Sequence, residues 1–203
     1  LVARLQESRP FFDLLAKSIV NAATMTLKMH MGADLDSDAT DNFTGTEEFG
    51  ISASSPSGLS MPGKIVSGAM TAGPGTMTIP IPLGTTPVNV SLKLAQAKGA
   101  LTTSTLTGGQ INGAIPMTEV NATLLPAMAT MLDDQYKTGD ASIKALLKGL
   151  FDSNGDGTIS TAEIKNNLII GLFLKADVDT DGDKKMDAMS AGLGFTGVSC
   201  KIK

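Results

Sequence analysis

The residues best suited to chemistry form a run of oxygen-bearing side chains between Asp152 and Glu163, where the chain reads Asp-Ser-Asn-Gly-Asp-Gly-Thr-Ile-Ser-Thr-Ala-Glu. Calcium takes about six to eight oxygen ligands from carboxylates, amide and backbone carbonyls, and water. Such oxygens recur at alternate positions here, so we expect a calcium site. Thr158 would act through its carbonyl and Ser160 directly or through water. The expected ligands are Asp152, Asn154, Asp156, Thr158, Ser160 and Glu163.

This spacing resembles the calcium loop of EF-hand proteins. Such a loop has a glycine at its sixth position, where the chain turns sharply, and a bidentate glutamate at its twelfth. Gly157 and Glu163 stand at these two places. Apolar residues at helical spacing flank the loop, and Asp140 can cap the first of the two expected helices. The apolar residues are Ile143, Leu146, Leu147, Leu150 and Phe151 before the loop, and Ile164, Leu168, Ile169, Leu172 and Phe173 after it.

A capping box offers an alternative explanation for the end of this run. In that motif Ser160 and Glu163 open the second helix by satisfying free N–H groups, and no metal ion is needed. The box does not account for the ligand-type side chains and the glycine that precede it at metal-ligand spacing. We therefore favour the calcium site.

A second acidic stretch, Asp177 to Asp187, is also a candidate for calcium, in either of two registers. A loop that starts at Asp177 has Gly182 at the turn position, but Lys184 then takes the apolar position and Ala188 the closing one. A loop that starts two residues later has Lys184 where the turn glycine is expected. This later register resembles the Asp-rich loops of thrombospondin type 3 repeats. The candidate ligands are Asp177, Asp179, Asp181, Asp183 and Asp187.

Other candidate sites are weaker. The stretch from Asp34 to Asp41 has acids at alternate positions, but it lacks the turn glycine and a clear closing carboxylate, so we expect a solvated loop. His30 is the only histidine, which excludes a multi-histidine metal centre. Cys200 is the only cysteine, which excludes an intrachain disulfide.

The composition is that of a globular chain, with 203 residues of which 42% are hydrophobic and 18% charged. A net charge of -4 and the lack of a basic stripe argue against a general nucleic-acid-binding protein. The longest apolar run, residues 168–174, is far too short for a transmembrane segment. The sequence shows neither a phosphate-binding glycine motif nor a nucleophile elbow.

Most of the chain before residue 118 predicts strands, after a first helix at residues 4–21. From Met25, apolar and polar residues alternate, which indicates a strand with one buried face. Pro80 and Pro82 indicate a sheet edge, because proline cannot donate a ladder hydrogen bond. An exposed edge can also accept a strand from another copy, as a homo-oligomer or filament, unless proline blunts it on that side. Further strands are expected at residues 64–72, 76–83, 88–94, 99–107 and 194–202, with a long surface connection at 42–63.

We therefore predict an α+β fold, in which an antiparallel β-rich body (meander, sandwich or barrel) carries helical segments and a carboxyl-terminal EF-hand-like calcium unit. A helix capped by Thr118 should run toward Tyr136, and Pro126 should kink or divide it. The expected division is a body at residues 1–136 with its helices at 4–21 and 118–136, a calcium unit at 137–192, and a closing strand at 193–203 that returns to the body. These parts can form one continuous domain.

A wider pattern begins at about Gly108. It comprises Gly-Ala-Ile-Pro ending at Pro116, a helix with an internal Leu-Pro, the loop followed by Glu-Ile-Lys-Asn, and Asp-Val-Asp-Thr-Asp-Gly-Asp before Asp-Ala-Met-Ser and Gly-Leu-Gly-Phe ending at Phe195. In these features about half of the chain resembles uncharacterised predicted lipoproteins of myxobacteria and related bacteria. The resemblance implies an extracytoplasmic location, whether secreted, outer-membrane-associated or at the cell surface.

Three functional classes follow from these residues. We favour a calcium-stabilised structural or surface-adhesion protein without catalysis, in which the ion fixes local geometry. One alternative is a calcium-dependent glycan-binding module or hydrolase, for which Glu47, Glu48 and Glu119 are available as acids but nothing fixes their separation. The other alternative is an EF-hand switch, in which calcium exposes a methionine-rich groove for a partner.

Overall fold

The computed structural model describes residues 21–36, 38, 40–53, 55, 60–83 and 86–203 of the chain. The predicted helix at residues 4–21 falls outside this set except for Asn21, which begins a strand. The chain divides into two compact units. One contains residues 1–78, 92–113 and 191–203, and the other contains residues 79–91 and 114–190.

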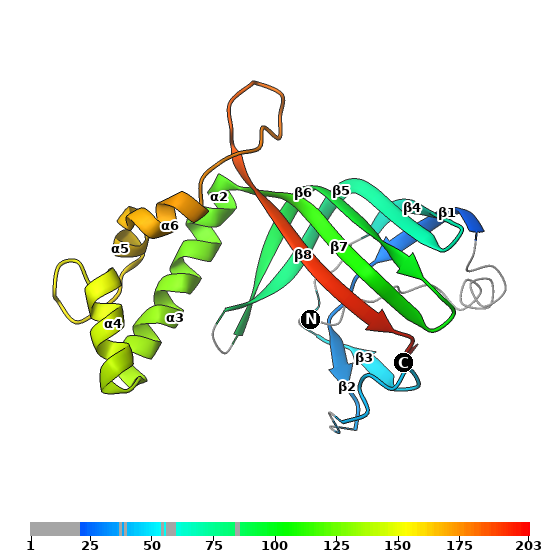
Figure 1. Ribbon diagram of the computed structural model, residues 1–203, viewed down its shortest axis with the longest axis horizontal. Coiled ribbons are helices and arrows are strands. Elements are labelled where there is room, and N and C mark those ends of the chain that lie inside the picture. Colours follow the sequence, from blue (N-terminus) through cyan, green and yellow to red (C-terminus); the bar gives the residue numbers. More distant parts are fainter. Residues whose placement is uncertain (1–20, 37, 39, 54, 56–59, 84–85) are drawn as a thin grey trace. The chain divides into compact units, whose positions relative to one another are not determined.

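Most strands belong to one six-stranded sheet with the order β1-β4-β5-β6-β7-β8 (Figure 1). Consecutive strands from β4 to β7 are neighbours, so this part is a meander, and a strand-rich body is confirmed. A smaller sheet has the order β2-β3-β9. The strands are β1 (Asn21–Lys28), β2 (Gly32–Asp34), β3 (Glu48–Ile51), β4 (Ser60–Val66), β5 (Ala69–Leu83), β6 (Thr86–Leu101), β7 (Thr105–Pro116), β8 (Ala188–Val198) and β9 (Lys201–Ile202).

Alternation of apolar and polar residues explains which face of each strand is buried. In β1, Met25 and Leu27 are buried and the threonines beside them are exposed, as predicted. In β6 the alternation holds for Val90 and Leu92 but fails at Leu94, which is 48% exposed. Leu94 has a φ of 53°, and this local irregularity places its side chain on the exposed face of the strand instead of the buried one.

Two predicted segments are wrong because the sequence pattern gave no signal for the turns within them. The expected surface connection at residues 42–63 contains β3 and the start of β4. The single strand expected at residues 64–72 is a hairpin, since Ser67 and Gly68 adopt φ values of 48° and 80°. Pro80 and Pro82 lie in the second half of β5, beyond the residues Ala69–Ala72 that pair with β4, so the sheet edge expected there stays a prediction. The outer strands of the sheet are β1 and β8.

The second unit contains the helices of the described residues, namely α2 (Met117–Glu119), a π-helical segment η1 (Val120–Leu124), α3 (Leu125–Thr138), α4 (Ala141–Phe151), α5 (Thr161–Asn166) and α6 (Leu168–Phe173). Thr118 does not cap this region, since Pro116 holds the cap position without a side-chain bond. Pro126 lies in the first turn of α3, where its missing N–H is tolerated, and the π-helical segment precedes it. The predicted single helix is therefore divided, as proline suggests.

Capping explains where the later helices begin. Asp140 accepts bonds from the N–H groups of Ser142 and Ile143, both at 2.9 Å, and starts α4 as predicted. The helix expected after the loop is interrupted at Asn167, which has a ψ of 125° and caps α6 with its own side chain. Asn167 also donates from Nδ2 to the carbonyl of Leu150 at 2.7 Å, so it ties the start of α6 to the end of α4.

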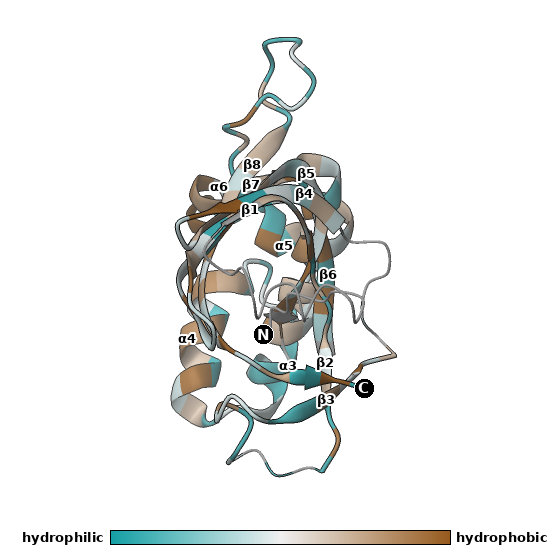
Figure 2. Ribbon diagram, turned by 90° about the vertical axis from the view of Figure 1, so that its right-hand side faces the viewer, coloured by the Kyte–Doolittle hydropathy of each residue, from teal (hydrophilic) through white to brown (hydrophobic). Residues whose placement is uncertain are grey.

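The helical region exposes several large apolar side chains, among them Leu146, Leu168, Leu172 and Phe173. Figure 2 shows hydrophobic residues in brown along the ribbon of α4. The buried core of the helical region is made by Val120, Leu124, Leu125, Ala129, Leu147, Ile159 and Ile164. None of the described helices combines the length and apolar character that crossing a membrane would require.

The burial difference along β6 yields a test of the fold. Leu92 is 1% exposed, so Leu92→Ala should lower the free energy of unfolding by about 2–5 kcal/mol. The same truncation two residues later, Leu94→Ala, should cost less than about 1 kcal/mol, since that side chain is largely solvated. Denaturant unfolding of both variants measures the two values. Equal losses would contradict the irregularity at Leu94.

Candidate functional site

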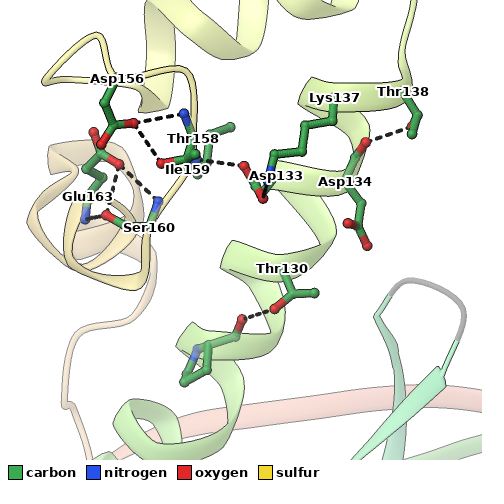
Figure 3. Close-up of polar contacts among 11 residues, drawn as sticks. Thr130, Asp133, Asp134, Lys137, Thr138, Asp156, Thr158, Ile159, Ser160 and Glu163 are labelled. Carbon is green, nitrogen blue, oxygen red and sulfur yellow. Dashed lines mark hydrogen bonds and ion pairs between the residues drawn. The ribbon is translucent and has the colours of Figure 1, made fainter.

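The first candidate loop joins α4 to α5 and ends in a capping box (Figure 3). The hydroxyl oxygen of Ser160 accepts from the N–H of Glu163 at 3.3 Å. In return, the N–H of Ser160 donates to Glu163 Oε2 at 2.9 Å. The local motif considered as an alternative to a metal site is therefore formed. It does not exclude a cation, because both explanations use the same carboxylate.

Glu163 also reaches the start of the loop. Its Oε1 accepts from the N–H of Ser153 at 2.8 Å and from the Ser153 hydroxyl at 3.2 Å. The pKa of Glu163 lies below its ordinary value, chiefly because the Ser160 N–H stabilises the carboxylate, and burial opposes this effect. Glu163 thus fastens the last position of the loop to the second, and it is 9% exposed.

Two glycines provide the turn that brings the chain back. Gly155 and Gly157 have φ values of 74° and 84°, a left-handed conformation that side chains disfavour. The N–H of Gly157 donates to Asp152 Oδ2 at 3.2 Å. The sixth position of the loop is therefore bonded to the first, which closes the turn around the Asp152 carboxylate.

A relay of side-chain to backbone bonds shapes the rest of the turn. Asn154 Oδ1 accepts from the N–H of Asp156 at 2.8 Å. Asp156 Oδ1 accepts from the hydroxyl and the N–H of Thr158 at 2.7 and 2.8 Å (Figure 3). These contacts, led by the Thr158 hydroxyl, hold the pKa of Asp156 below its ordinary value. The loop is therefore preformed with an ionised acid at its fifth position.

The hydrogen bonds of the first loop leave one oxygen of Asp152 without a partner among the described residues. The side chain is buried, at 7% exposure. Its Oδ2 accepts from Gly157 and from the hydroxyl of Tyr136 at 3.2 Å. Its Oδ1 is also buried, yet it has no hydrogen-bond partner among the described residues. An unsatisfied buried carboxylate oxygen is unfavourable, and a cation is the partner that suits it best. Asp152 Oδ1 is therefore an oxygen that a cation would satisfy, although Asp152, Asp156 and Glu163 are not among the groups of described acids whose oxygens lie within 4.8 Å of one another.

The second acidic stretch repeats this turn in the register that starts at Asp179. Gly182 and Lys184, its fourth and sixth positions, have φ values of 85° and 69°. The N–H of Lys184 donates to Asp179 Oδ2 at 2.7 Å, the counterpart of the bond from Gly157 to Asp152. Lys184 thus adopts the conformation expected of the missing turn glycine, and the geometry selects this register.

The second loop also has counterparts of the side-chain to backbone bonds and of the closing acid of the first loop. Asp181 Oδ1 accepts from the N–H of Asp183 at 3.1 Å. Asp187 accepts from the N–H and hydroxyl of Thr180 at 2.8 and 2.6 Å, as Glu163 does from Ser153. The second loop is therefore closed by an acid at its ninth position. Backbone bonds between Val178 and Ala188 join its two ends.

The carboxylates of Asp179, Asp181 and Asp183 converge, with one oxygen of each within 4.8 Å of the others. Asp177 is engaged elsewhere, since its two oxygens accept from the N–H and the hydroxyl of Ser190, both at 2.6 Å. The candidates of the second stretch thus separate into a converging group of three and two residues outside it, Asp177 and Asp187.

A third group combines Asp36, Asp41 and Glu47, again with oxygens within 4.8 Å. The pKa of Glu47 is raised, because burial and the charges of Asp41 and Asp36 outweigh the stabilising N–H of Glu48. Glu48 forms ion pairs with lysines of the carboxyl-terminal strand region. Glu47 and Glu48 are therefore in different surroundings. The sequence pattern of residues 34–41 contained no signal for Glu47.

Helix α3 supplies contacts that the sequence did not indicate. Asp133 Oδ1 accepts from the N–H of Ile159 at 2.9 Å (Figure 3). The hydroxyl of Tyr136 donates to Asp152 Oδ2. Lys137 forms an ion pair with Asp133 at 2.5 Å, which is the main cause of the lowered pKa of Asp133. No motif links these residues to a loop that lies further along the chain.

The strained Lys184 provides a test of the register. Lys184→Gly should stabilise the protein by up to about 1 kcal/mol, because glycine tolerates a φ of 69° far better than lysine does. Lys185→Gly removes the same charge from the next position and should give no gain. Thermal unfolding of both variants measures the difference. A stabilisation no larger for the first variant than for the second would contradict the register.

The lowered pKa of Glu163 predicts a pH dependence. The unfolded chain takes up a proton near the ordinary glutamate value of 4.5, above the folded pKa. The stabilisation is therefore complete above that pH and is lost as pH falls through the folded value. Unfolding measured in EGTA from pH 6 downward, in roughly half-unit steps, should show a steeper loss for wild type than for Glu163→Gln. Parallel curves would contradict this role.

No protein family, curated protein or solved structure matches the chain. Assignment of the site therefore depends on this chain's own geometry. Two features carry it: the turn shared by the loops at residues 152–163 and 179–187, and the buried oxygen of Asp152 that has no described partner.

Proposed function

We propose that the protein binds calcium at the EF-hand-like loop of residues 152–163 and uses the ion as a structural support, without catalysis. The observation that carries this proposal is the buried Asp152 Oδ1, which has no hydrogen-bond partner among the described residues. Around it, Gly155 and Gly157 already form the turn that such a loop requires. The site would be completed by Asn154, Asp156, Thr158, Ser160 and Glu163.

Binding would require a limited rearrangement of Glu163. Its two oxygens accept bonds from Ser153 and Ser160, and a bidentate calcium ligand must redirect them to the ion. The bonds that are weakened are replaced by stronger contacts to a divalent charge. Because the unfolded chain has no such assembled site, the binding free energy adds to the stability of the fold.

A second ion would bind at residues 179–187. Asp179, Asp181 and Asp183 converge there, and Asp187 occupies the place that Glu163 has in the first loop. Three close carboxylates repel one another unless a cation neutralises them. The converging acids support this second site, and the matching turn geometry supports the same ion for both loops.

An extracytoplasmic location agrees with such a role. Extracellular calcium modules bind at about 10⁻⁴ to 10⁻³ M, which suits surroundings rich in calcium. The resemblance of the second half of the chain to predicted bacterial lipoproteins points the same way. A protein at the cell surface, structural or adhesive, would gain a rigid segment from bound calcium where the free chain has an acidic loop.

Calcium-dependent thermal unfolding tests the proposal. The melting temperature should be higher in excess calcium than in EGTA, with a stabilisation of about 2.7 kcal/mol when calcium is 100 times its dissociation constant. In proteins that carry Asp181→Asn, which weakens the second site, Asp152→Asn should lose most of this increment, because the amide carries no charge for the ion. Asp134→Asn, which alters an exposed acid on α3, should keep it. A wild-type melting temperature that is the same in calcium and in EGTA would refute the proposal.

A further inference from the structure

Helix α3 contacts the first loop at two separate points. Asp133 and Tyr136 are three residues apart, so they lie on one side of the helix. Tyr136 donates its hydroxyl to Asp152 Oδ2 at 3.2 Å, at the first position of the loop. Asp133 Oδ1 accepts from the N–H of Ile159 at 2.9 Å, at the eighth position (Figure 3). One helix turn therefore holds the outgoing and the returning limb of the loop.

The first of these contacts orients the Asp152 carboxylate. Bonds from Tyr136 and Gly157 both end on Oδ2, so Oδ1 is the oxygen left without a partner among the described residues. A carboxylate fixed by hydrogen bonds on one oxygen presents the other in a defined direction. This removes rotational freedom that binding a cation would otherwise have to restrict.

The second contact fixes the returning limb. Ile159 is 3% exposed, and its backbone N–H would be a buried donor if Asp133 did not accept from it. Lys137 holds the Asp133 side chain from the opposite end of its carboxylate. The carbonyl of Thr158 belongs to the peptide group that carries this N–H. Anchoring the N–H therefore also anchors one of the expected calcium ligands.

We propose that Asp133 and Tyr136 are positioning residues of the calcium loop, and that α3 thereby sets its affinity for calcium. Neither residue is a ligand: each acts on a group that is. The inference rests on the proposed calcium site and adds to it two residues outside the loop. Partners that orient metal ligands typically contribute about 10- to 100-fold to metal affinity.

Calcium titration calorimetry on the full chain tests this. Tyr136→Phe and Asp133→Ala should each bind calcium about 10-fold more weakly at the first loop or worse. Asp133→Asn should bind nearly as wild type does, because its amide oxygen still accepts from Ile159. Asp134→Ala should also bind normally, since it removes an acid from the same helix without touching the loop. To isolate the first loop, all proteins carry Asp181→Asn, which weakens the second.

Two further measurements separate positioning from a loss of fold. Thermal unfolding in EGTA reports the stability of each calcium-free variant, and the titrations are done well below the lowest melting temperature. Tyr136 is the only tyrosine and the chain has no tryptophan. Its emission should therefore change on calcium addition in the proteins that retain it, with the same midpoint as the calorimetric titration.

The outcomes separate a failure of the proposed calcium site from a failure of the role proposed for α3. If the protein with an intact first loop takes up no calcium there, the proposed function fails. If it binds calcium and both Tyr136→Phe and Asp133→Ala bind equally well, only the role of α3 is overturned. If Asp133→Asn loses as much affinity as Asp133→Ala, the charge of Asp133 matters rather than its bond to Ile159, and the positioning role is again refuted.

Discussion

The helical unit depends on how two buried carboxyl groups at the ends of one loop are supplied with partners. Among the described residues, the buried charged side chains are Asp152 and Glu163, which stand at the first and last positions of one loop. Removing a carboxylate from water is strongly unfavourable unless hydrogen bonds or a cation compensate. Glu163 has such bonds on both oxygens, whereas Asp152 has them on one. This asymmetry is the physical reason to propose a metal ion beside Asp152.

Features that depend on neighbouring residues could be predicted from the sequence. The cap at Asp140, the glycine turn at Gly157 and the alternation in β1 are local, and all three occur as expected. The relay of side-chain to backbone bonds in both loops is equally local, because each bond spans two residues. A stretch of alternating oxygen-bearing side chains therefore specifies its turn directly, whether or not an ion binds there.

Other features depend on contacts or conformations that no local pattern specifies. Leu94 continues the apolar alternation of the sequence, but its backbone has a positive φ that the sequence pattern does not indicate. Similarly, Asn167 interrupts a helix within a run whose apolar residues keep helical spacing. The bonds from α3 to the loop join residues far apart in the chain. The register of the second loop was ambiguous because a lysine occupies a position where glycine is usual, and only the backbone angle of Lys184 decides it.

The break at Asn167 limits what calcium can do mechanically. α5 has six residues, a length of about 9 Å at 1.5 Å per residue, and Asn167 then binds the carbonyl of Leu150 in the helix before the loop. The loop-side end of the entering helix is thus linked to the far end of the exiting helix. Because α5 is short and linked to α4 by this bond, it has little freedom to rotate away from α4. An ion bound in the loop would therefore rigidify the helix pair and would not open it.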